Sequence, residues 1–114
     1  MPQKPARDEI PPGTLYLLIL RTLALRGKMH GWGIAEHIHE VSDVLHVEEG
    51  SLYPALQRML IKGWVSAEWG LSDNNRRARF YSLTPDGRRQ LQEELSQFER
   101  VNRGILRVLE WSGA

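Results

Sequence analysis

The sequence predicts a small α+β fold that is mainly α with a small β-hairpin. Three observations lead to this prediction. The chain has 114 residues and a mass of 13.1 kDa, which suits one folding unit of ordinary size. Hydrophobic residues make up 41% and charged residues 25%, close to the average of globular proteins. Apolar residues recur at helical spacing in four segments, and two short β-prone runs lie between the third segment and the fourth.

The sequence lacks the residues that several classes of chemistry require. It has no cysteine, which excludes disulfide frameworks, zinc fingers, iron–sulfur clusters and thiol nucleophiles. His37 and His39 would face different sides of a helix, and no carboxylate pair completes a ligand set, so no metal site is expected. Neither a Gly-rich phosphate loop nor a nucleophile elbow occurs, so we expect no enzymatic activity and no cofactor.

The sequence gives no sign of membrane insertion or secretion. Its longest apolar run, residues 15–20, is far shorter than the roughly 20 residues of a spanning helix. The polar, proline-rich segment that precedes this run differs from a secretory signal. The expected location is therefore the cytoplasm.

The predicted elements start after an extended arm. Residues 1–12 contain four prolines, which sustain neither a helix nor a sheet ladder. A first helix is predicted over residues 14–26, where apolar side chains recur at helical spacing and Gly27 provides a stop. The second face of this helix, which carries Leu17, is apolar too, so the helix must be covered from two sides.

Two more helices are predicted directly downstream. The first of these covers residues 31–41 and is entered through a Gly-Trp-Gly turn. The next covers residues 51–62 and has one apolar face, with a glycine as its stop. If that helix begins near Gly50, Pro54 falls in its first turn, where a backbone N–H has no partner within the helix.

A β-hairpin is predicted after the third helix. Residues 64–69 alternate between apolar and polar side chains, and residues 79–83 form a second β-prone run. The nine residues 70–78 between them are rich in turn-forming side chains, which predicts a long loop. Trp64 and Trp69 are expected to pack in the core of this hairpin.

The last predicted helix is unusually long. It starts after the N-cap Thr84 and can run to about Trp111, which gives a length of about 40 Å. A seam of heptad type follows it, with apolar residues and one asparagine at Leu91, Leu95, Phe98, Asn102, Ile105 and Leu109. Because the helix outreaches a three-helix core, we predict that this seam and Leu17 face a second chain. The alternative is that the seam packs only within one chain.

This order of elements is that of a winged helix-turn-helix with a C-terminal extension. In such folds the third helix enters the major groove of DNA, and the hairpin, or wing, contacts the backbone or the minor groove. We therefore predict DNA contacts from the outer face of the third helix, by Ser51, Tyr53, Pro54, Gln57 and Arg58. Glutamine can pair with adenine, and arginine can reach guanine or a phosphate.

Basic charge is concentrated around the predicted wing. The net charge is only +1, yet five arginines and only two aspartates lie within residues 70–89. Arg76, Arg77 and Arg79 are predicted to bind the DNA backbone, with an ordinary solvated turn as the alternative. His30, just before the second helix, either contacts a phosphate or caps a turn.

Three motifs in order resemble the PadR family of bacterial transcriptional regulators. They are Gly-Ser-Leu-Tyr-Pro-Ala-Leu at residues 50–56, Gly-Trp at 63–64 and Arg-Phe-Tyr-Ser-Leu-Thr-Pro-Asp-Gly at 79–87. Upstream, His-Gly-Trp at 30–32 is similar to the usual His-Gly-Tyr of the family, with tryptophan in place of tyrosine. The resemblance runs from about Gly13 to the end and fits the compact branch with a single long C-terminal helix.

The resemblance implies a homodimeric repressor. Its long helices would form the dimer, and its third helices would enter adjacent major grooves. It also implies a cavity between the long helices and the first helix that holds a planar aromatic or cationic effector. Trp32 and Trp111 are the candidates to line that cavity, with packing at the dimer interface as the alternative.

Taken together, the sequence predicts a flexible arm (1–12), a winged helix-turn-helix DNA-binding domain (13–84) and a C-terminal dimerisation helix (85–114). The predicted function is a sequence-specific DNA-binding transcriptional regulator, a repressor that binds a pseudo-palindromic operator as a homodimer and is released by a small effector. The small net charge leaves open a winged-helix protein-interaction module without DNA binding. A small-molecule carrier built at the dimer interface is a third possibility.

Overall fold

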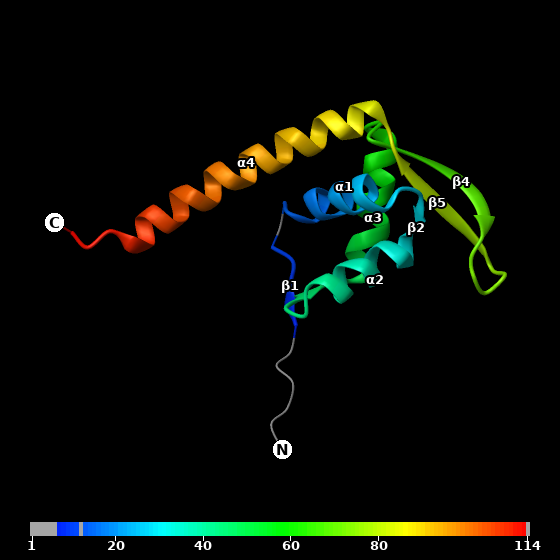
Figure 1. Ribbon diagram of the computed structural model, residues 1–114, viewed down its shortest axis with the longest axis horizontal. Coiled ribbons are helices and arrows are strands. Elements are labelled where there is room, and N and C mark those ends of the chain that lie inside the picture. The colour runs from blue at the N-terminus through cyan, green and yellow to red at the C-terminus, as the bar shows by residue number, and fades with distance from the viewer. Residues whose placement is uncertain (1–6, 12, 114) are drawn as a thin grey trace, which may run out of the picture.

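The computed structural model describes residues 7–11 and 13–113 of the chain. It contains helices α1 (Leu15–Arg26), α2 (Gly31–Val41), α3 (Glu49–Ile61) and α4 (Pro85–Glu110), and strands β1 (Asp8–Glu9), β2 (Met29–His30), β3 (Leu45–His46), β4 (Val65–Leu71) and β5 (Arg77–Leu83). The predicted α+β class and the winged helix-turn-helix order are confirmed. Figure 1 shows the first three helices as one body, with the β4–β5 hairpin projecting on one side and α4 extending far beyond the other.

One hydrophobic core lies between the helices and the base of the hairpin. Its fully buried large side chains are Ile19, Leu20, Leu23, Ile34, Leu52, Leu56 and Met59. Helix α1 runs through the centre, because it contacts α2, α3 and β5 as well as α4. Both apolar faces of α1 are therefore covered, as its sequence pattern predicts.

The hairpin is longer, and its loop shorter, than predicted. Strands β4 and β5 pair over all seven residues of each, so the loop is residues 72–76. Asn75 adopts a φ of 57°, the left-handed conformation that tight turns use. The nine-residue loop was a wrong prediction, because ladder hydrogen bonds join backbone groups and do not require apolar side chains. The short strand β2, which the sequence did not reveal, pairs with β5 and completes a three-stranded sheet.

Part of the predicted arm is built into the fold. Strand β1 pairs in parallel with β3, in the turn between α2 and α3, so the prediction that residues 1–12 form no sheet ladder is wrong. The prolines at 2, 5 and 12 lie outside the described residues. Just before β1, the Arg7 guanidinium donates to the backbone carbonyls of His39, Ser42 and Leu45. These contacts attach the segment to the helix-turn-helix, which composition alone could not show.

His39, near the end of α2, is expected to make the stability of this turn depend on pH. Its Nε2 accepts a 3.0 Å hydrogen bond from the backbone N–H of Val47. Partial burial, followed by the charges of Arg7 and His46, lowers the pKa of His39 below its ordinary value of 6.5. The folded state therefore favours the neutral ring, and the unfolded chain binds more protons at mildly acidic pH.

Melting curves of the free protein test this linkage. The stabilisation is complete above the pKa that His39 has in the unfolded chain, and it is lost as the pH falls through the pKa of His39 in the folded protein. The melting temperature is therefore expected to drop when the pH is lowered from about 7.5 to about 5.5. His39→Gln, whose side chain does not titrate, is expected to show a smaller drop. The same drop in both proteins would contradict the role of His39.

Helix α3 begins earlier than predicted, and Pro54 lies inside it. The backbone N–H groups of Ser51 and Leu52 both bond to the carbonyl of Glu48, which starts the helix at Glu49. Pro54 is therefore beyond the first turn, and the prediction of its place is wrong. Its missing N–H leaves the carbonyl of Gly50 without a helical partner, and both residues are exposed, so water can satisfy that carbonyl.

Helix α4 starts at the base of the hairpin, with the cap that its sequence predicts. The Thr84 hydroxyl accepts a 3.0 Å hydrogen bond from the backbone N–H of Gly87 and donates one of 2.6 Å to the carbonyl of Gly63. The backbone N–H of Thr84 donates to the carbonyl of Trp64 at 3.1 Å. The start of α4 is thereby held against the end of α3 and the start of β4.

Candidate nucleic-acid interface

Helix α3 presents an exposed stripe opposite its buried face. The stripe consists of residues at intervals of four, three and four along the helix: Gly50, Pro54, Gln57 and Ile61. Ile61 is 76% exposed, and a side chain of this kind can contact the methyl group of thymine. Ile61 was not among the residues predicted to contact DNA, although an apolar residue outside the buried stripe was a detectable signal.

Tyr53 lies on the α2 side of this stripe. A Cβ at Gly31, the first residue of α2, would lie 2.7 Å from Cε1 of Tyr53, so the ring packs where only glycine leaves room. Burial, followed by the charges of Glu49 and Tyr81, raises the pKa of the Tyr53 hydroxyl. The hydroxyl therefore stays protonated at neutral pH and can donate a hydrogen bond.

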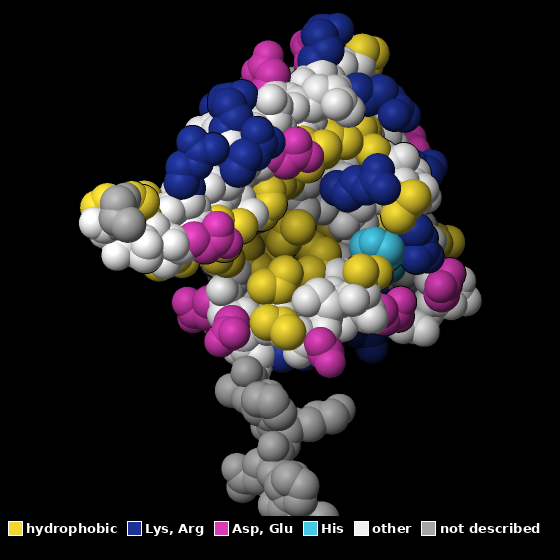
Figure 2. All heavy atoms as spheres, turned by 60° about the vertical axis from the view of Figure 1, so that its left-hand side comes forward, with side chains coloured by type: hydrophobic (Ala, Val, Ile, Leu, Met, Phe, Trp, Pro, Cys, Tyr) yellow, Lys and Arg dark blue, Asp and Glu magenta, His cyan; other side chains and the backbone are white. Residues whose placement is uncertain are grey.

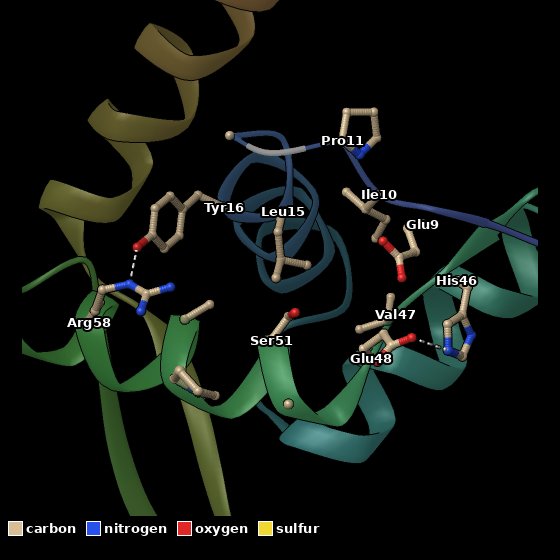
Figure 3. A pocket seen from close by; sticks show the side chains of 14 residues that line it. Glu9, Ile10, Pro11, Leu15, Tyr16, His46, Val47, Glu48, Ser51 and Arg58 are labelled. Atoms are coloured by element: carbon tan, nitrogen blue, oxygen red, sulfur yellow. Dashed lines mark hydrogen bonds and ion pairs between the residues drawn. The ribbon is translucent and has the colours of Figure 1, made fainter.

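Ser51 and Arg58 lie on the other side of the stripe, toward α1. They help to line a groove of about 550 Å³ between α3, α1 and the segment that precedes α1. Figure 3 shows Tyr16 and Arg58 at one end of this groove, and Glu9, Glu48 and His46 at the other. The α3 residues predicted for DNA binding thus share one helix but not one face, with Pro54 and Gln57 between the two flanks.

His30 caps α2. Its Nδ1 accepts a 3.0 Å hydrogen bond from the backbone N–H of Gly33, and its ring packs edge-on against Phe80, with the ring centroids 5.6 Å apart. Of the two roles left open by the sequence, the structure shows this capping contact. A phosphate contact by His30 stays a prediction.

The wing carries its arginines on a single face. Arg77 and Arg79 alternate along β5 with Tyr81, so all three side chains lie on the same side of the sheet, and Arg76 belongs to the loop. Tyr81 is buried in the core, so this face of the sheet turns toward the helices. Arg77 and Arg79 therefore lie on the same surface of the molecule as Tyr53, farther from the core.

Trp69 stands between these arginines and not in the core. It pairs with Arg79 across the hairpin and is 60% exposed. The guanidinium carbons of Arg77 and Arg79 lie 4.5 Å and 5.9 Å from its ring centroid, within the range of cation–π contacts. The prediction that Trp69 packs in the hairpin core is wrong, because the longer hairpin places it past the helices. Trp64, as predicted, packs against the core.

The apolar seam of α4 is only partly used within one chain. Leu91 is buried, and Leu95 and Phe98 join Leu17 around an apolar groove of about 690 Å³ between α4, α1 and the preceding segment. Further along, Ile105 and Leu109 are 53% and 74% exposed, and Asn102 is exposed beside them. Figure 2 shows apolar side chains along this side of α4 and in the hollow beneath it.

Comparison with known proteins identifies the family. Residues 19–93 match the transcriptional regulator PadR-like family. The chain belongs to this family. A solved transcriptional regulator from Clostridium thermocellum is 25% identical, with a TM-score of 0.74 over 83% of this chain and 92% of that one. A PadR family transcriptional regulator from Eggerthella lenta is 26% identical, with a TM-score of 0.72 over 86% and 83% of the two chains. No curated protein matches the chain.

Membership of the PadR-like family makes the chain a DNA-binding transcriptional regulator, a class distinct from the enzymes. Within residues 7–11 and 13–113, no three acidic, histidine or cysteine side chains are grouped as a metal site would require. In the same part of the chain, no helix combines the length and the apolar character needed to cross a membrane.

The two candidate effector residues of this PadR-like chain lie far apart. Trp32 is in the first turn of α2, and Trp111 follows the last residue of α4. These two ends of the helices lie on opposite sides of the molecule in Figure 1. Neither residue lines the apolar groove beside α4, so within one chain they do not form a common site.

Proposed function

We propose that this PadR-like regulator represses transcription by binding a pseudo-palindromic operator as a homodimer. The observation that carries the proposal is the exposed stripe of α3, with one arginine beside it on the same helix and two more on the neighbouring strand β5. A helix fits the major groove of DNA, which is about 12 Å wide and bordered by phosphates. Arg58 lies on the α1 side of the stripe, and Arg77 and Arg79 lie on the wing. Groups suited to bases and groups suited to phosphates are thus combined on one surface.

The exposed end of α4 supports a second copy as the partner. From Phe98 to Glu110 the helix continues for about 18 Å, with apolar side chains that the described part of the chain leaves uncovered. A two-fold axis would place the α4 end of each copy over the apolar groove of the other copy. Both exposed apolar surfaces would then be buried at once. We propose Leu17 and the six seam residues of α4, from Leu91 to Leu109, as the interface, with Asn102 setting the register.

The dimer defines the form of the operator. Two α3 helices related by a two-fold axis require an inverted repeat, with half-sites about one helical turn of DNA apart or a multiple of it.

We also propose that residues 13–84 form the DNA-binding domain and residues 85–114 the dimerisation helix. Release by an effector would act through the apolar groove beside α4, and Trp111 of the second copy would approach this groove if that copy's α4 end lies over it.

Selection of DNA by the purified protein tests this proposal. The protein is mixed with random genomic fragments at two salt concentrations, bound fragments are sequenced, and the mass of the protein in solution is measured. An inverted repeat enriched by a dimer at both salt concentrations supports the proposal. A monomer, or binding without any enriched motif that disappears at the higher salt, contradicts it and favours a protein-interaction module.

Two alanine variants separate base reading from backbone binding. Gln57→Ala is expected to weaken binding to the selected operator by roughly fivefold to a hundredfold and to leave binding to random DNA unchanged, since it removes a base contact. Tyr53→Ala is expected to act in the same direction. Arg77→Ala is expected to weaken both bindings equally and to lower the salt slope by about one. Fluorescence anisotropy over a salt series measures both quantities, and equal losses by Gln57→Ala on the two DNAs would contradict its role.

A further inference from the structure

A hydroxyl on α1 holds an arginine of α3 beside the DNA-reading stripe. Nε of Arg58 donates a 2.5 Å hydrogen bond to Oη of Tyr16 (Figure 3). The guanidinium carbon lies 5.8 Å from the centroid of the Tyr16 ring. The two residues are 42 positions apart in the sequence, so only the fold brings them together.

The ring of Tyr16 is itself fixed by its surroundings. It is partly buried against the core and meets Trp64 edge to face, with centroids 5.6 Å apart and planes at 88°. The Trp64 ring is in turn covered by Lys62, whose Nζ lies 5.1 Å from the centroid of that ring. The hydroxyl that Arg58 contacts therefore belongs to a ring that is packed on a helix of the core and not on a loop.

The terminal nitrogens of Arg58 remain available to a ligand. No carboxylate within the described residues forms an ion pair with Arg58. Figure 3 shows the acidic side chains that line the groove, Glu9 and Glu48, at the end opposite Arg58. Arg58 is exposed, and with Nε engaged it presents two NH₂ groups in the plane of the guanidinium, a geometry that matches two phosphate oxygens.

We propose that Tyr16 is a positioning residue that directs Arg58 to a phosphate of the DNA backbone and not to a base. The inference rests on the proposed function. The hydrogen bond draws the guanidinium toward α1 and away from the central stripe of Gln57 and Ile61. The major groove admits one helix, and α3 would occupy it. Helix α1 must therefore lie outside the groove, next to the phosphates of the DNA backbone that border it. Holding the side chain in advance also lowers the entropy lost when it binds.

The test compares full-length variants that change single groups. Tyr16→Phe keeps the ring and its packing on Trp64 but removes the hydroxyl, and Arg58→Met keeps an unbranched side chain but removes every N–H donor. Dissociation constants are measured on the selected operator and on a random duplex of equal length over a salt series. Arg100→Met, the same change on an exposed arginine of α4, serves as the control and is expected to bind like the wild type.

Tyr16→Phe is expected to weaken binding to both DNAs by the same factor, about threefold to tenfold, because the Arg58 side chain is no longer held in advance and must be ordered on binding. Its circular dichroism spectrum is expected to match that of the wild type, which excludes a general loss of structure. In the Arg58→Met background the same change is expected to have no further effect, because no N–H donor is left to bond to Tyr16.

The outcomes separate this inference from the proposed function. If the wild type binds no DNA, the proposed function fails. If the wild type binds and Tyr16→Phe binds equally well, the positioning role is wrong. A loss confined to the operator would show that Arg58 reads a base, and additive losses in the double variant would show that Tyr16 acts without Arg58. Either result overturns the inference.

Discussion

Ile105→Asp is expected to convert the proposed dimer into a monomer and to lower operator affinity at least about a hundredfold. Ile105 lies on the end of α4 that leaves the body and is 53% exposed in the single chain. In the dimer it would be covered by the second copy, where an unpaired carboxylate costs several kcal/mol. A monomer has only one α3 helix and loses the gain from binding two half-sites, which is typically about a hundredfold or more.

Ser96→Asp is the matched control for this experiment. It adds the same charge to the same helix, but Ser96 is nine positions away from Ile105 and therefore on the opposite side of α4. It is expected to stay dimeric and to bind the operator. Sedimentation equilibrium gives the mass, and circular dichroism checks that both variants are folded. A dimeric Ile105→Asp protein with full operator affinity would contradict the proposed interface.

Gly87→Ala is expected to produce a larger loss of stability than alanine at any other glycine of the chain. A Cβ at this position would lie 2.1 Å from the carbonyl oxygen of Trp64 and 2.7 Å from Cδ1 of Leu83. The oxygen cannot turn away freely, because it accepts the backbone hydrogen bond of Thr84. Relief of the clash must therefore separate α4 from the base of the hairpin, at a cost of roughly 2–4 kcal/mol.

Gly104→Ala, in the same helix, is expected to change the stability of the chain in the opposite direction. A Cβ at Gly104 meets nothing within 4 Å, so alanine is expected to stabilise the chain by up to about 1 kcal/mol through its higher helix propensity. Urea unfolding at one protein concentration measures both changes. A Gly87→Ala protein as stable as the wild type would mean that the contact between α4 and Trp64 is looser than the structure shows.

The parts of the fold that were predicted correctly each carry a signal within their own segment. Helix α2 has Ile34, Ala35 and Ile38 on one buried face, and a glycine on each side of Trp32 marks its entry. Helix α4 has its cap and proline at the start and a seam of regular spacing thereafter. Such signals require only neighbouring residues, so a single sequence is enough to find them.

The wrong predictions concern contacts between distant segments. Strand β2 and the β1–β3 pair have two residues each, too few for an alternating pattern. Pro54 suggested a helix start because proline favours the first turn, but the helix extends upstream of it, to Glu49, where it places Leu52 in the core. Trp69 was assigned to the core by its size, although the length of the hairpin determines where it lies.

Local periodicity in the amino-acid sequence was sufficient to establish the order of the four helices and the hairpin, the buried and outer faces of α3 and the apolar seam of α4. It could not establish that Tyr16 would orient Arg58, or that Arg77 and Arg79 would share the ring of Trp69. Helical and strand patterns repeat every few residues and can be read along the chain. The direction of a long side chain depends on partners that packing brings from elsewhere, so it emerges only when the helices and the hairpin are assembled.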